Sequence, residues 1–135
     1  MTDKYFEQGV AIRRDMFGPE GAEKQIDNAS AFMWPLQEFV TESCFGDVWH
    51  RDHLDRKQRS MLTLGMLLAM GKLPEIKTHV KGAIANGVTI EEIREVFVHG
   101  IIYCGVPAAV GAFRAASEVF QELGIDEGKR EEGGT

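Results

Sequence analysis

The segment Met61–Met70, MLTLGMLLAM, constrains the fold more than any other part of the chain. It is apolar nearly all the way round a helix, and a helix of this kind has to be covered on every side. It is also much shorter than the roughly 20 residues that span a bilayer, so we expect a buried helix of a soluble protein. One domain of 135 residues can hardly surround such a helix alone. This favours a homo-oligomer over the alternative, a compact monomeric bundle.

Helix start and stop signals divide the second half of the chain. Asp55 is a suitable N-cap for the helix that contains the apolar segment, and Gly71 ends this helix. Pro74 fits the first turn of a second helix, which ends near Asn86–Gly87. These signals predict two consecutive helices with a short connection.

Two further helices are expected after this pair. Thr89 and Glu92 form a capping box that opens a helix reaching Tyr103. The Gly105–Pro107 break then starts a last helix, which Gly124 closes.

The N-terminal part is also helix-like, over residues 2–16 and over residues 27–45, where Pro35 is expected to interrupt the helix. Strand signals are nearly absent. We therefore predict an all-α fold, a bundle of about six helices forming one domain over residues 1–124. The charged, glycine-rich segment 125–135 is predicted to be a disordered tail.

Composition narrows the setting. The net charge of −6 argues against nucleic acid or an anionic membrane as a partner. The first 15 residues lack the apolar stretch of a secretory signal. Cys44 and Cys104 lie sixty positions apart, which fits neither a disulfide framework nor a metal-binding spacing. We expect a cytoplasmic protein in a reduced setting.

The stretch HGIIYCGVPAAVGAF, residues 99–113, combines small residues with polar ones. Its glycines and alanines predict close contacts between helices and between subunits. His99 and Tyr103 share a helix face, and Glu95 could orient the His99 ring. A structural trio that satisfies its own hydrogen bonds is the alternative. Cys104 is expected to be a small buried residue rather than a reactive thiol.

The stretch WHRDHLDRKQR, residues 49–59, is the basic island of an acidic chain. Arg56 and Lys57 suit a solvated helix start. Arg59 continues onto the apolar face and suits a bidentate clamp for a carboxylate. His79, in KTHVKGAIANG, lies early enough in its helix to reach a cleft between helices, although a single histidine is more often structural.

Four stretches together resemble the γ-carboxymuconolactone decarboxylase family: FGDVW, HRDHLDRKQRSMLTLGMLLAMGK, THVKGAIANGVTIEEIREV and HGIIYCGVPAAVGAF. The stretch YFEQGVAIRRDMFGPE and residues 28–39 are similar to small stand-alone decarboxylases, so the resemblance covers nearly the whole chain. It implies the helical fold of the alkylhydroperoxidase D group, assembled into rings such as hexamers or trimers. The implied reaction is cofactor-independent decarboxylation of 4-carboxymuconolactone to 3-oxoadipate enol-lactone, in the protocatechuate branch of the β-ketoadipate pathway.

Two features depart from the family pattern. The peroxidase relatives have a CxxC pair, whereas Tyr103–Pro107 contains a single cysteine. The decarboxylases usually have an Arg-Pro-Gly-like turn where this chain has Arg51–His53. The first departure disfavours a peroxidase, and the second concerns the mouth of the pocket.

The reaction assigns three tasks to the site. Arg59, with Arg51 as second choice, is expected to hold the retained acetate carboxylate, and His79 to supply the proton. His99 and Tyr103 are candidates for hydrogen bonds to the developing oxyanion. The expected apolar lining, with Cys104 as one wall, consists of Phe45, Trp49, Met66 and Met70.

Three other functions stay open. One is a thiol-dependent peroxide reductase, with Cys104 as the reactive thiol and Cys44 resolving it. Another is an oligomeric scaffold without enzymatic activity. The third is a decarboxylase for a different lactone or β-keto acid.

Overall fold

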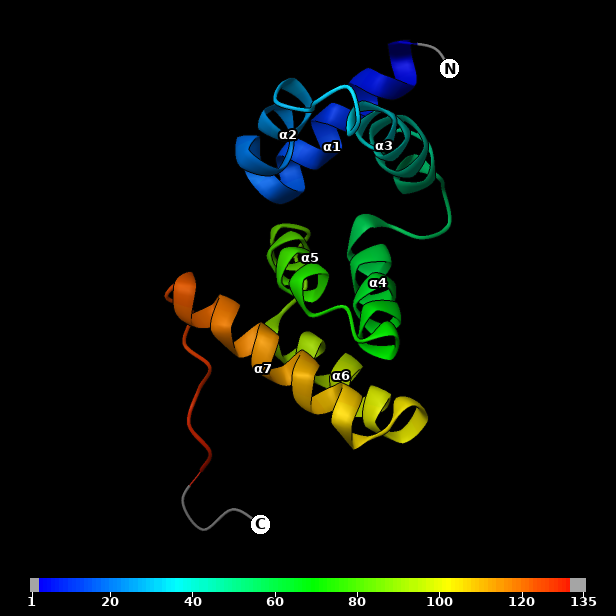
Figure 1. Ribbon diagram of the computed structural model, residues 1–135. Helices are drawn as coiled ribbons and strands as arrows, with labels where there is room; N and C mark the ends of the chain where they lie inside the picture. The colour runs from blue at the N-terminus through cyan, green and yellow to red at the C-terminus, as the bar shows by residue number, and fades with distance from the viewer. Residues whose placement is uncertain (1–2, 132–135) are drawn as a thin grey trace. The chain divides into compact units, whose positions relative to one another are not determined.

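The computed structural model describes residues 3–131, and these residues form helices and connecting loops without a strand (Figure 1). The predicted all-α fold is confirmed. The α-helices are α1 (Asp3–Gly21), α2 (Glu23–Asp27), α3 (Trp34–Phe39), α4 (Arg56–Met70), α5 (Leu73–Ala85), α6 (Ile90–Cys104) and α7 (Val106–Glu122). A π-helical segment, η1 (Val40–Phe45), and a 3-10 turn, η2 (Val48–His50), lie between α3 and α4. Within the described residues, no helix is long and apolar enough to cross a membrane.

The start and stop signals of the second half were predicted correctly. The Gln58 main-chain N–H donates to Asp55 Oδ1 at 2.7 Å, and the Asp55 N–H donates to Gln58 Oε1 at 2.9 Å, which caps α4. Gly71 ends the helix with φ of 68°, a left-handed conformation that favours glycine. Thr89 and Glu92 form the expected capping box of α6.

The N-terminal region differs from its prediction. Residues 28–33 form turns and a loop, and Pro35 lies in the first turn of α3. Proline fits there because the first N–H groups of a helix have no partner within the helix. Pro35 therefore starts a helix instead of interrupting one. The short helix α2 was not predicted and brings the number of α-helices in the described part to seven.

The chain divides into two compact units. The first unit consists of Met1–Leu62 and Lys81–Val88, and the second of Thr63–Val80 and Thr89–Thr135. Helices α4 and α5 each contribute residues to both units.

In the first unit, η1 packs against α1 at very short range. A Cβ atom on Gly9 would lie 1.8 Å from the Thr41 carbonyl oxygen, so only glycine permits this approach. The Arg13 side chain is buried next to Thr41, the residue that Gly9 approaches. Its guanidinium donates to the Gly21 carbonyl at 3.1 Å, to Gln37 Oε1 at 2.9 Å and to Thr41 Oγ1 at 3.0 Å. One buried arginine thereby joins the end of α1 to α3 and η1.

In the second unit, α6 and α7 lie side by side (Figure 1). Phe97 and Phe113 meet edge to face, with ring centroids 5.6 Å apart. A Cβ atom on Gly100 would lie 2.8 Å from Leu68 Cδ1, and one on Gly111 would lie 3.0 Å from Leu73 Cδ2. The prediction that the small residues of 99–113 allow close contacts between helices is therefore confirmed.

The apolar run of α4 is covered on only part of its circumference. Leu64 and Leu68 are fully buried, whereas 55% of Met66 and 64% of Met70 are exposed. This agrees with the expectation that a single chain of this size does not surround the helix, and coverage by a second copy of the chain stays a prediction.

The segment after α7 has no regular secondary structure over residues 125–131. The Ile125 N–H donates to the Phe120 carbonyl at 2.8 Å, and the Ser117 hydroxyl donates to Glu127 at 2.7 Å. The rest of the predicted disordered tail, residues 132–135, lies outside the described part of the chain.

Candidate functional site

The predicted site residues are distributed over both units. The first unit contains Phe45, Trp49, Arg51 and Arg59. The second contains Met66, Met70, His79, His99, Tyr103 and Cys104.

The first unit has a solvent-open hollow of about 410 Å³ where α1 meets the η1–η2 connection. It is lined by Tyr5, Gln8, Gly46, Asp47, His50, Arg51, Asp52 and His53. Gln8 Nε2 donates to the Gly46 carbonyl at 3.1 Å. A Cβ atom on Gly46 would lie 2.0 Å from the Tyr5 carbonyl oxygen. The wall of the hollow is therefore fixed by main-chain packing.

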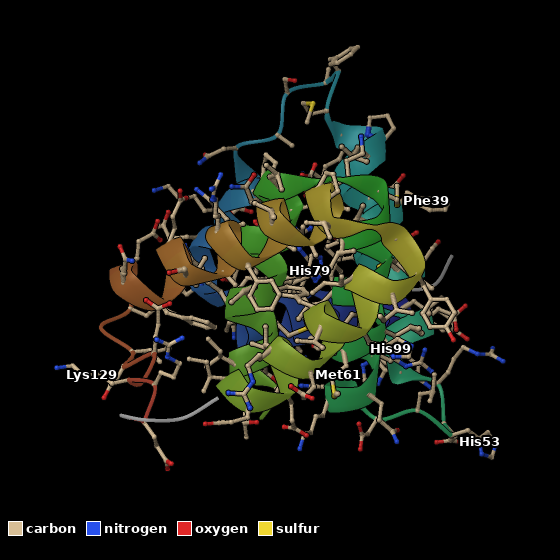
Figure 2. All side chains as sticks on the ribbon, turned by 90° about the horizontal axis from the view of Figure 1, so that it is seen from below. Phe39, His53, Met61, His79, His99 and Lys129 are labelled. Atoms are coloured by element: carbon tan, nitrogen blue, oxygen red, sulfur yellow. The ribbon has the colours of Figure 1, made fainter. Side chains whose placement is uncertain are left out.

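The loop between η2 and α4 forms the outer side of the hollow. The Arg51 side chain is exposed, while the Arg51 carbonyl accepts a hydrogen bond from Arg59 Nη2 at 3.3 Å. Arg59 is partly buried, and its Nε is inaccessible to solvent. His53 has φ of 79°, a left-handed conformation that is rare outside glycine and often found at functional sites. Figure 2 shows the His53 side chain at the outer end of this loop.

Phe45 and Trp49 belong to the core of the first unit. Their ring centroids are 5.6 Å apart, and both rings pack with Ile12 and Met16. Burial raises the pKa of the neighbouring Cys44 thiol, while a hydrogen bond with Trp49 opposes this shift. The packing of Trp49 fixes the turn that carries His50 and leads into Arg51. The role of the two rings as a substrate lining stays a prediction.

His79 is partly buried on α5, and its Nδ1 is inaccessible to solvent. Burial lowers the pKa of His79 because the charged imidazolium loses hydration, while the Glu75 carboxylate one turn earlier opposes the shift. The neutral imidazole therefore predominates at neutral pH. In that form the ring can donate or accept a hydrogen bond.

The His99 and Tyr103 side chains are exposed on α6, with ring centroids 4.9 Å apart and ring planes tilted by 37°; Figure 2 labels His99. Tyr103 is 77% exposed. Glu95 accepts a hydrogen bond from Arg94 Nε at 3.3 Å, and no hydrogen bond within residues 3–131 joins it to His99. The predicted orientation of His99 by Glu95 is therefore wrong, as is a buried trio.

Cys104 is exposed at the end of α6, and both cysteines are free thiols. The expectation of a small buried cysteine is thus wrong for the single chain. Its position at the helix terminus, followed by Gly105 with φ of 93°, leaves the side chain uncovered. In the described part of the chain, no group of three or more His, Cys, Asp or Glu side chains is arranged to hold a metal ion.

Tyr5 and Gln8 are residues that sequence reasoning missed. They reach the hollow only because α1 packs against a segment 38 positions later, as the Gln8–Gly46 hydrogen bond shows. His50 and His53 were visible in the basic island but were not singled out as site residues. The left-handed backbone at His53 has no sequence signal comparable to a glycine.

Comparison with known proteins gives consistent matches over most of the chain. The profile of the carboxymuconolactone decarboxylase family matches residues 35–118. A nitrosuccinic acid decarboxylase, npaB, of Metarhizium robertsii is 40% identical, over 93% of this chain and 87% of the relative. A 4-carboxymuconolactone decarboxylase of Acinetobacter baylyi is 34% identical, over 91% of this chain and 92% of the relative.

A third relative is an uncharacterized 15.0 kDa protein of Paracoccus denitrificans, 35% identical over 90% of this chain and 97% of the relative. The matched family profile covers more than half of the chain, and two of the relatives carry the name of a decarboxylase. The chain therefore belongs to the carboxymuconolactone decarboxylase family and is a carboxy-lyase.

Proposed function

We propose that this carboxy-lyase decarboxylates 4-carboxymuconolactone to 3-oxoadipate enol-lactone, without a cofactor, in protocatechuate degradation by the β-ketoadipate pathway. The observation that supports this substrate is the 34% identity to a 4-carboxymuconolactone decarboxylase over 91% of the chain. We expect the enzyme to act in the cytoplasm, where the free thiols of Cys44 and Cys104 stay reduced.

The proposed substrate carries its own electron acceptor. The departing carboxylate is attached to the ring carbon γ to the lactone carbonyl, across a carbon–carbon double bond. When the bond to this carboxylate breaks, carbon dioxide leaves and the electron pair moves through the double bond onto the carbonyl oxygen. A proton then adds to the carbon α to the carbonyl and gives the enol-lactone. The enzyme's tasks are to hold the second carboxylate, to stabilise the oxyanion and to deliver the proton.

A nitrosuccinate is the second candidate, because the relative named as a nitrosuccinic acid decarboxylase is 40% identical. Its chemistry is analogous: the departing carboxylate is on the carbon that bears the nitro group, which takes the electron pair as a nitronate. A second carboxylate is again retained. Both candidates therefore place the same demands on the site, a cation for the retained carboxylate and hydrogen-bond donors for a developing anion.

His79 is our candidate for the proton-handling group. Its lowered pKa favours the neutral imidazole in the free enzyme, and binding of an anion close to the ring would favour protonation. The imidazolium formed in this way can then deliver the proton. Tyr103 and His99 are the candidates for donating hydrogen bonds to the developing oxyanion.

The same family assignment supports a homo-oligomer, a ring such as a hexamer or trimer. Large apolar side chains of the second unit are exposed in the single chain, among them Met66, Met70, Ile102 and Val106. Large apolar side chains that gather on an exposed surface are typical of contacts between subunits. We propose that a second copy of the chain covers this surface.

The test compares the two substrates side by side with purified protein that has been treated with a chelator. Loss of the lactone and release of carbon dioxide are followed for 4-carboxymuconolactone, and carbon dioxide release is followed for nitrosuccinate. Faster turnover of the lactone supports the proposal, and faster turnover of nitrosuccinate replaces it with the second candidate. His79→Gln should lower kcat about 100-fold or more if His79 handles the proton.

A further inference from the structure

The loop Arg51–Asp55 is held in place from its two ends. At its start, Arg59 Nη2 donates to the Arg51 carbonyl at 3.3 Å. At its end, Asp55 and Gln58 exchange hydrogen bonds of 2.7 and 2.9 Å. Between these points the chain passes through the left-handed conformation of His53. A backbone held this way projects the side chains of the loop in fixed directions.

The two arginines of this region differ in what their guanidinium groups can do. A bidentate clamp on a carboxylate uses two N–H groups on one edge of the guanidinium. In Arg59 the edge formed by Nε and Nη2 is not open to a ligand, because Nε is inaccessible to solvent and Nη2 donates to the main chain. Arg51 is exposed and lines the hollow, and within residues 3–131 no hydrogen bond or ion pair engages its side chain.

We propose that Arg51, and not Arg59, contacts the carboxylate that the substrate retains, and that Arg59 is a positioning residue that holds Arg51 through its main-chain carbonyl. The identity of the ligand rests on the proposed function, whereas the division of roles rests on the geometry. His50 and His53 also line the hollow, and an imidazole N–H can donate a further hydrogen bond to a carboxylate oxygen.

Two carboxylates, Asp47 and Asp52, line the same hollow. They make it unfavourable for a ligand that places several negative charges there, because like charges at close range repel. One carboxylate placed beside Arg51 is repelled less by these groups than a polyanion would be. The hollow therefore suits a ligand that places a single carboxylate there.

The experiment measures binding of succinate, a dicarboxylate that lacks the electron acceptor needed for decarboxylation, by isothermal titration calorimetry on the full chain. The wild type should bind succinate saturably, and Arg51→Gln should weaken the binding at least about tenfold, the effect of losing a charge-assisted hydrogen bond. Arg59→Lys keeps one donor for the Arg51 carbonyl and should stay within about threefold of the wild type. Arg59→Met removes that donor and should bind more weakly than Arg59→Lys.

Arg56→Gln is the matched control, because it removes the same charge from the same region. Arg56 Nη1 pairs with Asp15 at 3.0 Å and does not line the hollow. This variant should bind succinate within about twofold of the wild type, since exposed charges that do not contact the ligand act only weakly. Circular dichroism confirms that all variants are folded.

If Arg59→Lys weakens the binding of succinate as much as Arg51→Gln does, Arg59 is the clamp and the inference is overturned. Absence of saturable succinate binding in the wild type would overturn it as well. Kinetics give a separate readout: Arg51→Gln should raise KM more than it lowers kcat, because it removes binding that substrate and transition state share. If neither 4-carboxymuconolactone nor nitrosuccinate is decarboxylated, the proposed function fails. The succinate affinities of the arginine variants still decide the roles of Arg51 and Arg59.

Discussion

Gly46 and Gly65 offer a sharp test of the packing described above, because the same substitution should have opposite effects at the two positions. A Cβ atom on Gly46 would lie 2.0 Å from the Tyr5 carbonyl oxygen and 2.6 Å from the Glu42 carbonyl oxygen, both main-chain atoms. The nearest neighbour of a Cβ atom on Gly65 is Val96 Cγ1, at 3.9 Å. Gly46 has ordinary helical angles, φ −75° and ψ −34°, so the cost of alanine there is steric alone.

The magnitudes follow from these distances. Gly46→Ala requires the main chain of α1 to move away from η1, and overpacking of this kind costs about 1–3 kcal/mol or more. Gly65→Ala adds a methyl group in ordinary van der Waals contact inside α4 and should stabilise by about 0.5–1 kcal/mol, the difference in helix preference. The two variants should therefore differ by about 1.5–4 kcal/mol in the free energy of unfolding.

The assay is urea denaturation followed by circular dichroism, at one protein concentration for all variants, since association would otherwise shift the midpoint. Gly46→Ala should also raise KM, because Gly46 lines the hollow. Equal stability of the two variants would show that α1 and η1 do not approach each other as described. A destabilising Gly65→Ala would likewise contradict the open space beside Gly65.

Three further predictions concern other parts of the chain. Burial lowers the pKa of His79 below its unfolded value, so the unfolded state binds the proton more tightly and the wild type should lose stability as pH falls below about 6.5. The difference between the melting temperatures at pH 5 and pH 7.5 should be smaller for His79→Gln than for the wild type. Arg13→Met leaves the three acceptors of the buried guanidinium without their donor and should lower the free energy of unfolding, measured in urea, by about 2 kcal/mol. The control Arg14→Met removes an exposed arginine and should change this free energy by less than about 1 kcal/mol. Ile102 is 78% exposed in the single chain and should be buried in the proposed oligomer. Ile102→Glu should therefore reduce the mass measured by light scattering after size exclusion, and an unchanged mass would place the interface elsewhere.

The sequence predicted the helices of the second half closely, because their ends depend on local chemistry. The caps formed by Asp55 and Thr89 and the left-handed Gly71 act within four or five residues of chain, so each can be read without knowing the fold. The helical class and the family resemblance were likewise correct. The role of Pro35 was not, because proline is compatible with either the start or the interruption of a helix.

The candidate site could be predicted only in part. The basic island pointed to Arg51 and Arg59, but the sequence favoured Arg59 because of its helical position beside the apolar run. The tertiary structure shows Arg59 bonded to the Arg51 carbonyl and Arg51 in the hollow, a distinction that no spacing rule contains. The exposure of Cys104 was also missed, since periodicity tells which residues are apolar and not which faces are covered.

The sequence by itself determined the helical class, most helix ends and the family, all of which depend on neighbours along the chain. Only the tertiary structure decided which side chains share the hollow. Tyr5 and Gln8 reach it because glycines at positions 9 and 46 let two main-chain segments approach closely. Such contacts depend on the excluded volume of atoms far apart in sequence, and that volume is defined only once the chain has folded.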